Sequence, residues 1–127
     1  MSTTRLLCVG DSFTEGMSDV LRADGHHVGW ADRVAVALAR EASASGGRVE
    51  YANLAVRGKL LDQVVDEQVP VAASFEPTVT TFHAGPNDVL RRGTDLRDLF
   101  GRYDRAVRSV TADDPPRRSV PRCRMGA

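Results

Sequence analysis

The sequence has few cysteines and no excess of charge of either sign. Cys8 falls in an apolar segment and Cys123 in a polar one, so the two suggest neither a disulfide framework nor a metal site. Seventeen acidic residues balance seventeen basic ones, and a chain without net charge has no field that attracts nucleic acid or an anionic membrane. These scarcities favour a protein of the reducing cytoplasm that acts on small molecules.

Long apolar runs are also missing. The apolar residues 6–9 are too few for the core of a signal peptide or for a membrane span, and they lead into Gly-Asp rather than a cleavage site. No glycine-rich loop ends in Lys-Ser or Lys-Thr, and no G-x-G-x-x-G follows a strand, so nucleotide binding is disfavoured. With 127 residues, the chain can form one domain.

Three short apolar segments predict buried strands, namely residues 5–9, 49–54 and 78–82. Each runs into a turn rich in glycine, aspartate or asparagine. Helical periodicity lies between and after them, and strands that alternate with helices predict parallel strands joined by right-handed crossovers. The sequence therefore predicts an α/β sandwich whose reactive edge lies at the carboxyl ends of its strands.

The predicted helices carry recognisable start and stop signals. One covers residues 30–43, and a second begins at residue 61, where Leu61, Val64, Val65 and Gln68 share one face until Pro70 kinks or ends the helix. A third covers residues 96–110 and has Thr94 or Asp95 as its expected cap.

The last fifteen residues differ in composition from the rest of the chain. Residues 113–127 contain three prolines and four arginines and have no periodicity. We therefore expect one domain over residues 1–112 and an irregular, disordered tail over residues 113–127. A change of reading frame in a GC-rich gene is the alternative explanation of this composition.

Three motifs follow the three predicted strands in order. Residues 10–16 read Gly-Asp-Ser-Phe-Thr-Glu-Gly, residues 53–58 read Asn-Leu-Ala-Val-Arg-Gly, and residues 85–88 read Gly-Pro-Asn-Asp. Together they resemble blocks I, II and III of the SGNH, or GDSL, hydrolase family, over about residues 4–110. A lone Gly-Asp-Ser would be a weak sign, whereas three blocks in family order are specific.

The resemblance implies a flavodoxin-like three-layer α/β/α fold with a parallel sheet. It also implies that Ser12 is the nucleophile, and that the backbone N–H groups of Ser12 and Gly58 and the side chain of Asn87 form an oxyanion hole. These residue types suit the chemistry, because a serine hydroxyl attacks once a base takes its proton and each oxyanion donor contributes about 3 kcal/mol. No metal and no organic cofactor is expected.

Further motif residues are expected to organise the site. Gly10 belongs to this set, Gly85 permits the tight turn that aims Asn87, and Asp11 and Asp88 accept backbone hydrogen bonds. Taken alone, Ser12 would more often cap the loop or helix after the first strand. In combination with the two other oxyanion-hole residues, the nucleophile becomes the better interpretation.

One block of the family has no counterpart. Block V, an Asp-x-x-His pair that orients and supplies the base, is missing because no histidine follows residue 88. Two histidines are candidate surrogate bases: His27, which completes an Asp-x-x-His over residues 24–27, and His83, at the end of the third strand. Each is also explained as an ordinary pocket-rim or strand-end side chain.

Four more side chains allow two interpretations each. Phe13 and Trp30 either line an acyl pocket or pack into the core. Arg91 and Arg92 either receive an anionic substrate or face solvent.

The sheet is expected to be truncated to about three strands. In the family's strand order the third strand then becomes an exposed edge, which favours self-association of the chain.

Two functions from different classes follow. The first is a serine esterase or acylhydrolase that cuts small carboxylic esters or acetyl groups, with a small acylated molecule as its partner. The second is a non-catalytic product, either a truncated fragment or a remnant that binds such a ligand without turning it over, because loss of the base costs a serine triad about four orders of magnitude in rate.

Overall fold

The computed structural model describes residues 2–16, 20–21, 23–25 and 27–110, and it describes only the backbone of Val20, Leu21 and His27. The proposed tail, residues 113–127, lies outside the described residues. The elements, in chain order, are β1 (Thr3–Gly10), α1 (Ser12–Glu15), β2 (Val20–Leu21), β3 (His27–Val28), α2 (Trp30–Ala44), β4 (Arg48–Asn53), α3 (Leu61–Glu67), α4 (Val69–Phe75), β5 (Val79–His83), α5 (Pro86–Val89) and α6 (Leu96–Val110).

The main sheet has three parallel strands in the order β4-β1-β5. Strand β1 is central because its residues Leu6 to Gly10 are apolar or small and are buried on both faces of the sheet. In its register, Cys8 lies opposite Asn53 of β4 and Gly10 lies opposite His83 of β5. The three predicted strands and the predicted α/β class are confirmed.

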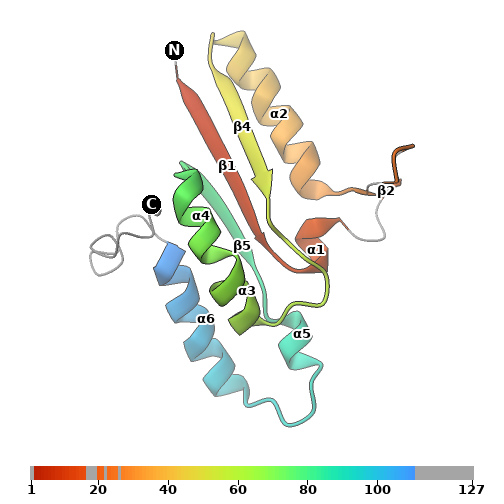
Figure 1. Ribbon diagram of the computed structural model, residues 1–127, viewed down its shortest axis with the longest axis vertical. Helices are drawn as coiled ribbons and strands as arrows, with labels where there is room; N and C mark the ends of the chain where they lie inside the picture. Colours follow the sequence, from red (N-terminus) through yellow and green to blue (C-terminus); the bar gives the residue numbers. More distant parts are fainter. Residues whose placement is uncertain (1, 17–19, 22, 26, 111–127) are drawn as a thin grey trace.

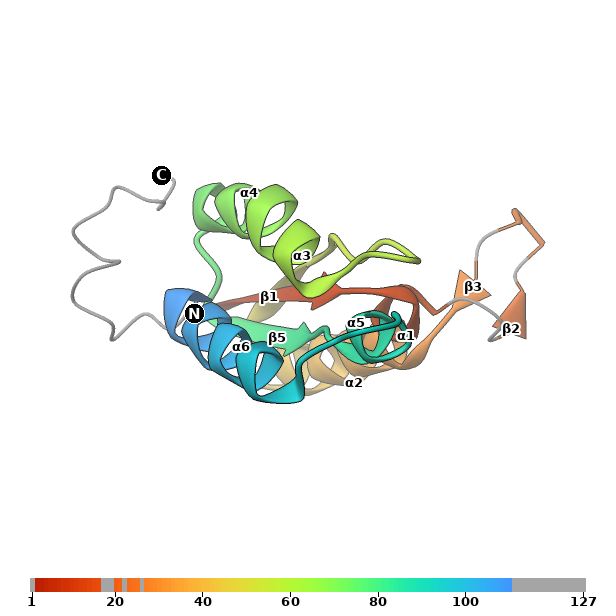
Figure 2. The same cartoon turned by 90° about the horizontal axis from the view of Figure 1, so that it is seen from below.

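Helices cover both faces of this sheet. Leu7 and Val9 of β1 point to one face and pack in a cluster with residues of α3, α4 and α6, whereas Leu6 and Cys8 point to the other face and pack against α2. Figure 2 shows α3 and α4 on one side of the sheet and α2 on the other. The predicted three-layer α/β/α arrangement is therefore confirmed.

The helix boundaries follow the signals in the sequence. Helix α3 ends at Glu67, and Pro70 occupies the first turn of a new helix, α4, where its missing N–H has no intrahelical partner to lose. The sequence predicted the break but not the second helix. Asp95 caps α6, since its Oδ1 accepts from the backbone N–H groups of Arg97 at 3.0 Å and Asp98 at 3.2 Å.

A short strand pair and a short helix were not predicted. Strands β2 and β3 form an antiparallel pair of two residues each, in which His27 lies opposite Leu21. Helix α5 has four residues and contains the Pro-Asn-Asp of block III. Neither is long enough to show a periodicity.

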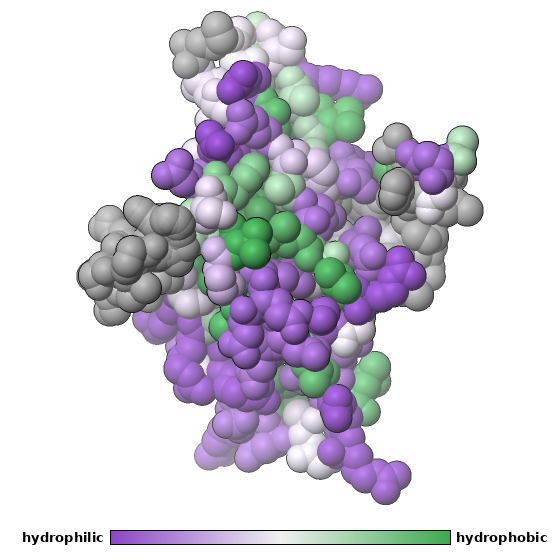
Figure 3. Space-filling view, in the orientation of Figure 1, coloured by the Kyte–Doolittle hydropathy of each residue, from purple (hydrophilic) through white to green (hydrophobic). Residues whose placement is uncertain are grey.

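Apolar side chains remain accessible on one face of the molecule. Figure 3 shows them gathered across the middle of the face that carries α3 and α4. Val71 of α4 is 52% exposed, and Phe100 of α6 is 67% exposed. In the described ranges, no helix is long and apolar enough to cross a membrane.

Candidate active site

The three motifs meet at one edge of the sheet. Because β4, β1 and β5 are parallel, their carboxyl ends lie together, and Figure 1 shows α1, the β4–α3 loop and α5 at that same end. Ser12 follows β1, Gly58 lies in the loop after β4, and Asn87 follows β5. The fold thus collects the three residues that the resemblance assigns to nucleophile and oxyanion hole.

Ser12 is the first residue of α1. The capping residue is Asp11, not Ser12, because Asp11 Oδ1 accepts from the backbone N–H of Phe13 at 3.2 Å. The N–H groups of a helix's first turn have no intrahelical acceptor. Ser12 therefore combines a hydroxyl with a backbone donor at the start of a helix, an arrangement that suits a developing negative charge.

Gly10, the last residue of β1, is held by two hydrogen bonds and by a close contact with β5. The Gln68 side chain is buried and binds the Gly10 backbone twice, with Oε1 accepting from Gly10 N at 2.8 Å and Nε2 donating to Gly10 O at 2.9 Å. Gly10 has φ of 152°, and a Cβ there would collide with the carbonyl oxygen of His83. Only glycine fits this close approach of two strands.

The block II loop is tied to α1. Arg57 contacts Glu15 three times, through its backbone N at 2.8 Å, Nε at 3.2 Å and Nη2 at 3.1 Å. This pairing raises the pKa of Arg57. Asn53 adds a bond from Nδ2 to the carbonyl of Thr14 at 2.9 Å. Next to Arg57, Gly58 is exposed, and its φ of 78° explains the glycine.

Block III in turn holds the block II loop. Asn87 Nδ2 donates to the Lys59 carbonyl at 3.0 Å, one residue beyond Gly58, and the buried Asp88 accepts from the backbone N–H of Leu61 at 2.8 Å. Gly85 is the residue that precedes α5, with φ of 117°. The loops that carry Gly58 and Asn87 are therefore joined by hydrogen bonds.

Of the two candidate surrogate bases, only His83 has a described side chain. Its Nδ1 lies 3.5 Å from Asp11 Oδ1, and its ring packs against that of Phe13 with centroids 4.6 Å apart. The backbone of His27 belongs to β3, and its side chain lies outside the described part of the chain.

The structure also shows the surroundings of the two aromatic and two arginine side chains for which the sequence allowed either a substrate-binding or an ordinary structural role. Phe13 is 59% exposed and its ring lies 5.9 Å from that of Trp30, which packs partly against the core on the α2 side. Arg91 and Arg92 are exposed and line a hollow of about 530 Å³ beside Asp88. Phe13 is thus accessible next to Ser12, and both arginines face solvent.

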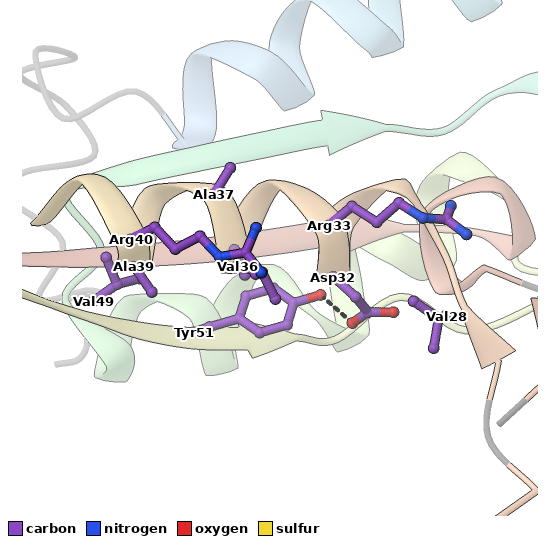
Figure 4. A pocket seen from close by; sticks show the side chains of 10 residues that line it. Val28, Asp32, Arg33, Val36, Ala37, Ala39, Arg40, Val49 and Tyr51 are labelled. Atoms are coloured by element: carbon purple, nitrogen blue, oxygen red, sulfur yellow. Dashed lines mark hydrogen bonds between the residues drawn. The ribbon is translucent and has the colours of Figure 1, made fainter. Parts of the chain in front are cut away.

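A second hollow, of about 550 Å³, lies over α2 and β4, and neither Ser12, Gly58 nor Asn87 lines it. Figure 4 shows Tyr51 in this hollow with its hydroxyl directed at Asp32, to which it donates at 2.8 Å. Burial, then this hydrogen bond, raises the pKa of Tyr51. Within the described segments, no three His, Cys, Asp or Glu side chains are grouped to hold a metal ion.

Gln68 and the Glu15–Arg57 pair have positioning contacts that the sequence did not assign. For Gln68 the sequence did contain a sign of a buried polar contact, because this polar residue shares a predicted helical face with the apolar Leu61 and Val64. Glu15 and Arg57 both lie inside the motifs quoted for the resemblance, but nothing in the sequence shows that blocks I and II touch there.

A comparison with protein-family models tests whether the chain belongs to the family that its motifs resemble. The model of the GDSL-like lipase/acylhydrolase family matches residues 8–126. The chain belongs to this family. No curated protein matches it significantly.

Three solved structures share the fold of this chain. A Parabacteroides merdae protein described as a GDSL-like lipase has 18% identity and a TM-score of 0.65 over 89% of this chain. The psychrotrophic esterase EstA from Pseudoalteromonas sp. has 17% identity and a TM-score of 0.58 over 87%, and a variant of the acetyl xylan esterase Axe2 from Geobacillus stearothermophilus has 23% and 0.54 over 89%. The chain spans 55% of the length of each of the three.

Proposed function

We propose that the protein is a serine esterase or acylhydrolase of the SGNH type, which hydrolyses small carboxylic esters or removes acetyl groups through an acyl-serine intermediate. One observation carries the proposal. The hydrogen bond from Asn87 to Lys59 at 3.0 Å joins blocks II and III at the edge where Ser12 begins α1. Nucleophile and oxyanion donors of such a hydrolase come from these three places.

Each residue then has a defined task. Ser12 Oγ attacks the ester carbonyl carbon while a base takes its proton, and the alcohol leaves when the tetrahedral intermediate collapses. The negative oxygen of that intermediate accepts hydrogen bonds from the N–H groups of Ser12 and Gly58 and from Asn87. The Asn87 amide has two hydrogens, and the bond to Lys59 uses one of them. Water then releases the acid from Ser12.

Substrate class and cofactor use follow from the same chemistry. EstA is an esterase and Axe2 an acetyl xylan esterase, which supports small esters and acetyl groups as substrates of this chain as well. The steps above transfer an acyl group and a proton, so the proposal invokes no metal and no organic cofactor. The proton acceptor is a histidine in the family that the motifs resemble, and His27 and His83 are the candidates within this chain.

The test is Ser12→Ala, with Ser43→Ala as the matched control because Ser43 is an exposed serine on α2. Hydrolysis of p-nitrophenyl acetate and the mass of the protein after treatment with a fluorophosphonate are measured. We expect Ser12→Ala to lower the enzyme-dependent rate about a thousandfold or more and to abolish the adduct, and Ser43→Ala to change neither.

Two outcomes contradict the proposal in different ways. Turnover that is unchanged in Ser12→Ala excludes Ser12 as the nucleophile. A wild-type protein that shows no turnover but shifts its melting temperature with an acyl ligand is instead the binding remnant.

A further inference from the structure

His83 is held on two sides at the carboxyl end of β5. Its backbone lies opposite Gly10, so close that a Cβ on Gly10 would collide with the His83 carbonyl oxygen. Its ring packs against Phe13, with centroids 4.6 Å apart and the planes tilted by 38°. The imidazole therefore has a fixed place beside the first turn of α1.

One atom of that ring has no hydrogen-bond partner among the described residues. His83 Nδ1 is buried and unpartnered, although the side chain as a whole is 40% exposed. The group that faces it is Asp11 Oδ1, at 3.5 Å, and the Asp11 side chain is only 3% exposed. A buried polar atom without a partner is costly. A movement of about half an ångström brings the two atoms to hydrogen-bond distance.

The carboxylate that faces His83 is the one that caps α1. The same Oδ1 of Asp11 accepts from the backbone N–H of Phe13 at 3.2 Å, so its position sets where the first turn of the helix begins. Ser12 is the first residue of that turn. A donor that fixes Asp11 therefore also restrains the backbone from which Ser12 presents its hydroxyl and its N–H.

We propose that His83 is a positioning residue, whose Nδ1–H donates to Asp11 Oδ1 and thereby holds the cap of α1 and Ser12 in place. The inference rests on the proposed role of Ser12 as the nucleophile. It assigns His83 a task through Asp11, in contrast to a direct role as the base that takes the Ser12 proton.

Two substitutions separate these roles. In His83→Phe the ring against Phe13 is kept but the donor is lost. In His83→Asn the ring is lost but the side-chain amide carries an N–H on the atom that corresponds to Nδ1. If the donor matters, the asparagine variant performs better than the phenylalanine variant. Simple packing predicts the reverse order.

The first measurement is the rate at which a fluorophosphonate modifies Ser12 in the full chain, followed by intact mass. We expect His83→Phe to slow the reaction about tenfold, the effect of one hydrogen bond to a charged group, and His83→Asn to stay within about threefold of wild type. Equal large losses in both variants would identify His83 as the base and overturn the proposal. No loss in either variant, or a larger loss in His83→Asn, would overturn it as well.

The second measurement needs no reactivity. Nitrogen-15 NMR of the imidazole reports which ring nitrogen carries the proton, and the His83 signals are assigned by their absence in His83→Asn. We expect the Nδ1–H tautomer in the wild type, and the Nε2–H tautomer would refute the proposed donor. A wild-type Ser12 that does not react contradicts the proposed function, whereas this measurement still decides whether His83 donates to Asp11.

Discussion

Replacing Gln68 with leucine should loosen the end of β1. The Gln68 side chain is 5% exposed, and its two buried hydrogen bonds both go to the backbone of Gly10, at 2.8 and 2.9 Å. Leucine fills a similar volume and can make neither bond. The substitution therefore removes the polar contacts and keeps most of the packing between α3 and β1.

The two lost bonds have different costs. Gly10 O keeps a partner, because the backbone N–H of Val56 also donates to it at 3.2 Å, so that loss costs about 1 kcal/mol. Gly10 N loses its Gln68 acceptor in a buried place, which costs about 1 to 3 kcal/mol. We expect the free energy of unfolding to fall by about 3 kcal/mol, a large share of the roughly 5 to 15 kcal/mol of a typical domain.

Urea unfolding followed by the fluorescence of the single tryptophan, Trp30, measures this loss. With a slope of about 2 kcal/mol per molar urea, the midpoint should fall by about 1.5 M. Asp66→Leu is the control, because Asp66 is exposed on α3, two residues before Gln68, and it should change stability by less than about 0.5 kcal/mol. A Gln68→Leu protein as stable as this control would refute the reasoning.

Two further predictions concern pH and association. Burial raises the pKa of Cys8 and Tyr51 above their ordinary values of 9.0 and 10.0, and the hydrogen bond to Asp32 adds to the rise for Tyr51. The unfolded chain therefore releases these protons at lower pH than the folded one, so the free energy of unfolding should be full below about pH 9 and fall above it. The fall should be less steep in Tyr51→Phe. Urea midpoints that do not change between about pH 8 and pH 10.5 would contradict this prediction. Strand β5 has β1 as its one neighbour among the described strands, and its first residue, Val79, is 46% exposed. We therefore expect copies of the chain to associate through this edge of the sheet. Val79→Lys should raise the dissociation constant of this self-association, measured by sedimentation, about tenfold. Equal constants for the two proteins would count against that edge.

The parts of the fold that the sequence predicted are those with a repeated pattern. Each main strand is a short apolar run that leads into a turn, and α6 shows a full helical period over fifteen residues. The pair β2–β3 and helix α5 have two to four residues per element. Contacts with the rest of the fold, rather than a local pattern, decide the structure of segments this short.

The same distinction applies to the site. Ser12, Gly58 and Asn87 could be named because each stands in a motif at a strand end. The contact between Gln68 and Gly10 spans 58 positions of the chain, and it depends on how α3 packs against β1. The approach of His83 to Asp11 depends on the register of β5 against β1. Neither register nor helix packing can be read from one sequence.

Three of the motif side chains, those of Asp11, Asp88 and Asn87, bind backbone groups. Asp11 accepts from Phe13 N, Asp88 accepts from Leu61 N and Asn87 donates to Lys59 O. These bonds hold the turns at the edge of the sheet, so replacing any of the three should lower stability as well as rate. Replacing Ser12, whose hydroxyl is the proposed nucleophile, should lower the rate without lowering stability. Measuring both quantities in the four variants therefore separates the residues that build the site from the one that reacts.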